Sequence, residues 1–183
     1  MNPILDRNPS LQSDLAPRDG NSYVKGPKVP PLAYTSISKL LRDAATRYGS
    51  REALIFPNNR LNYYDFDQTV DALAAGFLAL GLDKGDRLGI WSPNRLEWVL
   101  TQFATARIGV LLVNINPAYR LSELEYSLNT VGCKAIVLAQ SLKSSNYLQM
   151  IRTLAPEIDT CSQGKLHSIK LPQLRHVIVM GNV

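Results

Sequence analysis

Arg87-Leu-Gly-Ile-Trp91 is a mostly apolar run that leads directly into the turn Ser92-Pro93-Asn94. Asn94 can cap a helix whose apolar residues recur every three or four positions, and Gly109 supplies its stop. The run Val-Leu-Leu-Val follows at residues 110–113, which predicts a buried strand. Because neither apolar run alternates with polar residues, both faces of their sheet should be covered. The stretch therefore predicts an α/β fold class, with a mostly parallel sheet layered with helices.

Helical and strand patterns continue on both sides of this stretch. Thr35 or Ser36 can cap a helix near the start of the folded region. Ser122 and Glu125 match the Ser-x-x-Glu pattern of a capping box, which predicts a helix start at Ser122. The predicted helices cover residues 36–48, 66–80, 95–108, 122–131 and 145–155, and the further predicted strands cover residues 52–56, 61–63, 135–138 and 176–180.

The first 33 residues differ in composition from the rest. They contain prolines at positions 3, 9, 17, 27, 30 and 31 and few apolar residues, so they should form neither a helix nor a core of their own. They also have no apolar run of signal-peptide length. We therefore divide the chain into an irregular N-terminal arm, residues 1–33, and a folded region, residues 34–183.

The overall composition is that of a globular protein. The 183 residues are 45% hydrophobic, which is enough to bury one core. The net charge of +5 is not gathered in a basic run, and this argues against a nucleic-acid partner. We expect no membrane span and a cytoplasmic protein.

Metal and nucleophile chemistry find little support in the sequence. His167 and His176 have no partner at metal-ligand spacing, and Cys133 and Cys161 are expected to be free thiols. No serine lies in a Gly-x-Ser-x-Gly turn. We therefore assign no metal site and no catalytic residue.

Three turns are candidates for a binding site. Parallel strands place their carboxyl ends at one edge of the sheet, where ligands of α/β folds bind. The turns at that edge should be residues 92–94, 114–120 and 139–143. Arg120 and Lys143 could meet a phosphate, and the asparagines could donate or accept hydrogen bonds. The alternative is that the asparagines only form caps and turns, and that Trp91 and Trp98 belong to the core.

Several motifs resemble those of adenylate-forming acyl-CoA synthetases. The segment Leu61-Asn-Tyr-Tyr-Asp-Phe66 is similar to the start motif of that family, and residues 106–117 are similar to its second conserved segment. The family's linker matches residues 80–87, and its Pro-Asn turn matches residues 93–98. The resemblance covers about residues 35 to 183 and is greatest to the medium-chain fatty acyl-CoA ligases. It implies the N-terminal subdomain of the adenylate-forming fold.

The resemblance also implies an activity and its ligands. The family activates a fatty acid with ATP and magnesium to an acyl-adenylate, and then forms a thioester with CoA. By motif, the residues expected near CoA are Asn116, Pro117, Ala118 and Tyr119 in one loop, and Lys143 and Ser144 in another. The resemblance alone leaves the mitochondrial matrix as an alternative compartment.

The family's phosphate loop, ribose-binding aspartate and adenylation lysine have no counterpart in residues 1–183. We therefore expect an N-terminal fragment of a fatty acid–CoA ligase that is inactive by itself, binds no cofactor tightly, and needs the C-terminal part of the enzyme as its partner. The alternative is a non-catalytic binding or interaction module that reuses the subdomain, since a fold does not guarantee an activity.

Overall fold

The computed structural model describes residues 34–162 and 164–181. The predicted N-terminal arm, residues 1–33, lies outside the described residues. The elements below all belong to one compact unit of the chain, Thr35–Val183.

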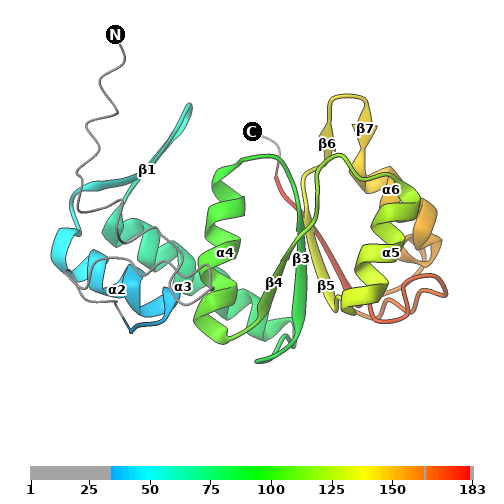
Figure 1. The fold of residues 1–183 in the computed structure, drawn as a ribbon, viewed down its shortest axis with the longest axis horizontal. Coiled ribbons are helices and arrows are strands. Elements are labelled where there is room, and N and C mark those ends of the chain that lie inside the picture. Colours follow the sequence, from blue (N-terminus) through cyan, green and yellow to red (C-terminus); the bar gives the residue numbers. More distant parts are fainter. Residues whose placement is uncertain (1–33, 163, 182–183) are drawn as a thin grey trace, which may run out of the picture. The chain divides into compact units, whose positions relative to one another are not determined.

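A four-stranded sheet lies at the centre of this unit (Figure 1). Its strands are β3 (Arg87–Trp91), β4 (Leu111–Asn114), β5 (Ala135–Leu138) and β8 (His176–Val179). The order is β4-β3-β5-β8 and every pairing is parallel, which confirms the predicted α/β fold class. The two central strands are buried almost throughout, because helices cover both faces.

Helices from different parts of the chain cover the two faces of the sheet. On one side lie α2 (Ile37–Tyr48), α3 (Tyr63–Ala79) and α4 (Leu96–Ile108), which pack on one another. On the other side lie α5 (Leu121–Val131) and α6 (Tyr147–Leu154), which is followed by the short helix η1 (Pro156–Asp159). The caps are those that the sequence favours. Ser36 Oγ accepts from the Lys39 amide at 3.2 Å, and Asn62 Oδ1 accepts from the Asp65 amide at 2.7 Å.

A buried ion pair joins α3 to α4. The Arg107 guanidinium donates to the Asp67 carboxylate, and the two side chains are only 9% and 10% exposed. Arg107 Nε also lies 3.2 Å from Asp71, which Arg42 of α2 approaches at 3.3 Å. Charges from three helices thus meet beside the apolar contacts, which include an edge-to-face pair of Phe66 and Phe103 with ring centroids 5.1 Å apart.

Two antiparallel hairpins stand outside the main sheet. The first, β1 (Glu52–Phe56) with β2 (Asn59–Asn62), confirms the predicted hairpin, although Tyr63 belongs to α3 and not to the strand. The second, β6 (Ser141–Leu142) with β7 (Ser145–Asn146), was not predicted. Because β7 takes up Ser145 and Asn146, α6 begins at Tyr147 and not at Ser145, and Asn146 caps it by accepting from the Gln149 amide.

Two predicted helix caps differ from those observed, and α3 begins at Tyr63, three residues earlier than predicted. Asn94 does not cap α4, because the extended backbone continues through Arg95, whose φ is −144°. The predicted capping box is also displaced. Helix α5 begins at Leu121, and Glu123 Oε2 accepts from the Arg120 amide at 2.9 Å. At α5 a capping box still forms, but it joins Arg120 and Glu123 and not the predicted Ser122 and Glu125.

The strand predicted to be buried at residues 110–113 is an edge strand. Among the described strands β4, observed as Leu111–Asn114, pairs with β3 alone, and Leu111 is 53% exposed. The run is apolar although β4 lies at the edge of the sheet. The residues that flank β4, Val110 and Ile115, are buried.

Candidate functional site

The carboxyl ends of the parallel strands meet at one edge of the sheet. Backbone hydrogen bonds continue past the strands there: the Ile115 amide donates to Ile90 O at 3.0 Å, and the Ala139 amide donates to Trp91 O at 3.1 Å. At the far side, the Met180 amide donates to the carbonyl that ends β5. The three turns singled out in the sequence therefore leave the sheet at the same edge, as predicted.

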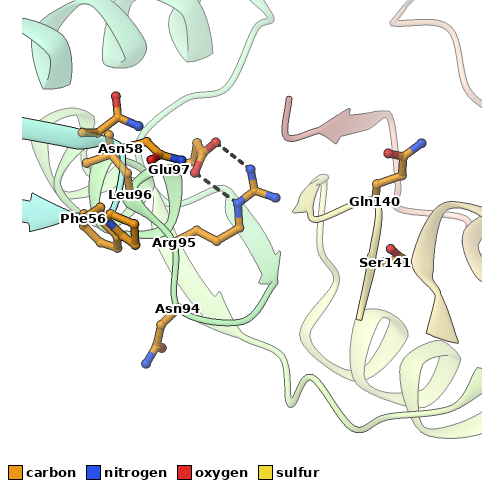
Figure 2. Close-up of a pocket in the computed structure, with 10 residues that line it drawn as sticks. Phe56, Asn58, Asn94, Arg95, Leu96, Glu97, Gln140 and Ser141 are labelled. Atoms are coloured by element: carbon orange, nitrogen blue, oxygen red, sulfur yellow. Dashed lines mark hydrogen bonds and ion pairs between the residues drawn. The ribbon is translucent and has the colours of Figure 1, made fainter. Parts of the chain in front are cut away.

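A cleft of about 480 Å³ opens at this edge (Figure 2). The tip of the β1–β2 hairpin forms one side of it, and the segments that follow β3 and β5 form the rest. It is lined by Phe56, Pro57, Asn58, Asn59, Asn94, Arg95, Leu96, Glu97, Gln140 and Ser141. The cleft thus combines three apolar side chains, several amide groups and one ion pair, which suits a ligand with both apolar and hydrogen-bonding parts.

The ion pair in the cleft is formed by Arg95 and Glu97. Arg95 Nε lies 3.2 Å from one carboxylate oxygen of Glu97, and Nη2 lies 2.9 Å from the other. Nη2 also donates to the Gly181 carbonyl at 2.7 Å, so this guanidinium ties the chain that follows β8 to the start of α4. Since Glu97 compensates its charge, Arg95 acts here as an oriented donor and not as an unpaired cation.

Arg95 was not among the site residues predicted from the sequence. Residues two apart on a helix do not face each other, so Arg95 and Glu97 gave no pairing signal. The pair forms because Arg95 precedes α4 in an extended conformation, while Glu97 lies in its first turn.

An aromatic pair supports the loop that follows β4. The rings of Trp91 and Tyr147 stack with centroids 3.8 Å apart and an angle of 17° between their planes, and both residues are fully buried. Trp91 Nε1 donates to Asn116 O at 3.0 Å, and the Tyr147 hydroxyl donates to Pro117 O at 2.6 Å. Burial raises the pKa of Tyr147, so this hydroxyl keeps its proton and remains a donor. Trp91 therefore belongs to the core, and its hydrogen bond to Asn116 O holds the loop in place.

The first four predicted site residues form that loop. Asn116 Oδ1 accepts from the Ala118 amide at 2.9 Å, and Asn116 O accepts from the Tyr119 amide at 3.0 Å. Asn116 therefore forms a turn, which is the function that the alternative interpretation of the sequence assigned to the asparagines. Asn116 and Ala118 are exposed, while Pro117 and Tyr119 are partly buried. The loop is thus a rigid, exposed turn on a buried aromatic support.

The other two predicted site residues, Lys143 and Ser144, form the exposed tip of the β6–β7 hairpin. Lys143 has a φ of +52°, an uncommon value for a residue other than glycine. Strand β7 contacts the first loop beside this tip, because Arg120 Nη1 donates to Ser145 Oγ at 3.1 Å. The structure thus brings the two predicted loops together, but none of the six predicted residues is among those lining the cleft of Figure 2.

Two negative findings apply to residues 34–162 and 164–181. None of the helices there is both long and apolar enough to cross a lipid bilayer. In the same residues, no three His, Cys, Asp or Glu side chains gather closely enough to hold a metal ion.

Comparisons with known proteins agree with the architecture. A sequence model of the family described as AMP-binding enzyme matches residues 41–176. The chain is 44% identical to the mitochondrial medium-chain acyl-CoA ligase ACSF2 of Danio rerio, over 96% of this chain and 28% of that protein. It is 35% identical to the putative acyl-CoA synthetase YngI of Bacillus subtilis, over 82% of this chain and 28% of that protein.

Solved structures show the same fold. The inhibitor-bound N-terminal domain of FACL13 from Mycobacterium tuberculosis superposes with a TM-score of 0.66 at 22% identity, over 79% of this chain and 33% of that one. The chain thus spans about 28% of the length of the curated relatives it matches.

Proposed function

The chain belongs to the AMP-binding enzyme family, and from this membership we propose that it forms the N-terminal part of an ATP-dependent fatty acid–CoA ligase. The observation that carries the proposal is its similarity, over nearly all of its length, to a protein named medium-chain acyl-CoA ligase. The division into an arm, residues 1–33, and a subdomain, residues 34–183, belongs to the same proposal.

The proposed reaction has two steps. A fatty acid carboxylate attacks the α-phosphate of ATP, which gives an acyl-adenylate and releases pyrophosphate. The thiol of CoA then attacks the acyl carbonyl, which forms the thioester and releases AMP. This chain would contribute the cleft wall that carries Arg95, together with the two loops on the Trp91–Tyr147 support.

We propose that the two loops contact CoA during the second step. Asn116 and Ala118 are exposed on a turn of fixed shape, and Lys143 and Ser144 are exposed on the neighbouring hairpin. An ammonium group and hydroxyl and amide donors are suited to the phosphates and amides of CoA. Magnesium does not fit the cleft in the same way, since Glu97, the carboxylate among the lining residues, is already paired with Arg95.

The compartment is also a proposal. The cytoplasm is the expectation from the sequence, with the mitochondrial matrix as the alternative, and the name of the Danio rerio relative, which includes the word mitochondrial, supports a mitochondrial location.

A chimera tests the function. In the Danio rerio ligase, this chain would replace the segment that it matches, and the product would be assayed with ATP, CoA and medium-chain fatty acids. We expect acyl-CoA formation by the chimera and no pyrophosphate release from ATP by residues 1–183 alone. The cleft has one cation, Arg95, and Glu97 already pairs with it, so little positive charge remains for a transition-state phosphate.

If the chain were a non-catalytic module, the chimera would form no acyl-CoA. A soluble, folded chimera that forms neither acyl-adenylate nor acyl-CoA would favour this alternative. Sustained pyrophosphate release by residues 1–183 alone, above a control without protein, would contradict both interpretations.

Lys143→Ala in the active chimera should raise the KM for CoA by up to about fivefold, the effect of one exposed ion pair. Acyl-adenylate formation, measured as exchange of pyrophosphate into ATP, should not change, because only the second step would use this contact. Lys165→Ala removes another exposed lysine, from a different loop, and serves as the control. An unchanged KM for CoA, or equal losses in both steps, would remove Lys143 from the CoA site.

A further inference from the structure

A second polar pocket lies at the opposite edge of the sheet, where the strands begin. Arg87 is the first residue of β3, and Lys134 and Arg175 directly precede β5 and β8. The Lys134 amide donates to Arg87 O at 2.9 Å, and the Arg175 amide donates to Lys134 O at 2.8 Å. Parallel pairing thus sets three cationic residues side by side. They line a pocket of about 280 Å³, the basic pocket, together with Asp86, Gly132 and Gln173.

The positive charge of the basic pocket is only partly compensated. Lys134 Nζ pairs with Asp86 Oδ2 at 2.7 Å and donates to Gly81 O at 2.8 Å. Arg175 Nη1 is held by two neutral carbonyls, those of Pro172 and Leu174. Within residues 34–162 and 164–181, no carboxylate forms an ion pair with Arg87 or Arg175. Three cations therefore face one carboxylate.

The charges of these cations affect the pKa values of neighbouring titratable groups. Burial lowers the pKa of His176, and the charges of Lys134 and Arg175 lower it further. Burial would raise the pKa of Asp86, but hydrogen bonds from Lys134 and the Asp83 amide and the charges of Lys134 and Arg87 outweigh it, so the pKa is lowered. The charges of the lining cations thus contribute to both pKa shifts.

The size of the basic pocket and its hydrogen-bond donors favour a small anionic ligand. The lining side chains are charged or polar and no hydrophobic residue is among them, so an apolar group finds no partner there. Guanidinium groups match the oxygens of a phosphate, and the exposed Gln173 amide adds another donor. We propose that the basic pocket binds the phosphate group of a small anion, at a site separate from the cleft. The five residues of β3 set the two about 16 Å apart.

Nuclear magnetic resonance of the 183-residue chain can test this site. Inorganic phosphate, pyrophosphate and AMP would be titrated separately at low salt while the amides of residues 86–87, 132–134 and 173–175 are followed. We expect saturable shifts confined to these amides, and the tightest of the three anions identifies the source of the phosphate. Arg87→Gln should weaken binding about tenfold, because it removes a charged hydrogen bond. Lys39→Gln, an equal loss of charge on the exposed face of α2, should leave the affinity unchanged.

Gln173→Glu provides a second variant, which puts a carboxylate into the pocket at an exposed position and should also weaken binding. Shifts that never saturate, or equal weakening by Arg87→Gln and Lys39→Gln, would overturn the proposal. So would Arg87-dependent binding of phosphatidylglycerol vesicles or duplex DNA without saturable binding of a small anion, since the surface would then serve a macromolecule.

Discussion

Arg107→Met should lower the free energy of unfolding by about 3–5 kcal/mol, because the substitution leaves the Asp67 carboxylate buried without its cation. Methionine keeps much of the arginine's apolar stem, so the loss would come from the charge and not from a cavity. Urea denaturation followed by circular dichroism measures the change.

Two further variants separate this explanation from a general loss of packing. Lys39→Met breaks the exposed pair with Asp43 and should change stability by less than about 1 kcal/mol. The double variant Arg107→Met with Asp67→Leu removes both buried charges and should recover most of the loss. If the double variant were no more stable than Arg107→Met alone, the unpaired carboxylate would not be the cause.

Trp91→Ala should cost a similar amount, about 3–5 kcal/mol, because a fully buried ring is replaced by a cavity. The change also removes the ring that stacks on Tyr147 and the donor to Asn116 O. Hydrogen exchange should therefore become faster at the amides of Ala118 and Tyr119, beyond the change expected from global stability alone.

The comparison with Trp98 tests whether these effects on stability and exchange depend on the position of Trp91 or would follow the loss of any tryptophan. Trp98 is only partly buried, so Trp98→Ala should cost clearly less and should leave exchange in the 116–119 loop unchanged. Trp91→Phe keeps most of the buried ring, so its cost in free energy of unfolding should be smaller than that of Trp91→Ala. If Trp91→Ala left exchange at the Ala118 and Tyr119 amides no faster than Trp98→Ala does, the aromatic pair would not hold the loop.

The sequence predicted those parts of the fold that depend on local patterns. The apolar run that became β5 was recognised with its correct bounds, and Gly109 and Gly132 ended helices in the left-handed conformation that glycine tolerates. The hairpin β6–β7 was missed because Ser-Leu-Lys-Ser-Ser-Asn has neither a glycine nor β-branched residues, and Lys143 takes the positive φ instead.

The candidate site was only partly accessible from sequence. Parallel strands predict which turns share an edge, and the structure places residues 92–94, 114–120 and 139–143 there. The hydrogen bond from Arg95 to Gly181 joins residues that are 86 positions apart, and no local pattern reports such a contact. The same is true of the Tyr147 hydroxyl, whose bond to Pro117 O depends on how α6 docks beside the β4 loop.

The stacking of Trp91 on Tyr147 also gives the protein an optical reporter. The chain has two tryptophans, so Trp98→Phe would leave the indole of Trp91 as the single tryptophan fluorophore. Its N–H is bonded to Asn116 O and its stacking partner is bonded to Pro117 O, so a shift of this loop changes both the polarity and the quenching around the ring. Movement of residues 116–119 would therefore be visible as a change in emission wavelength and intensity, without any attached dye.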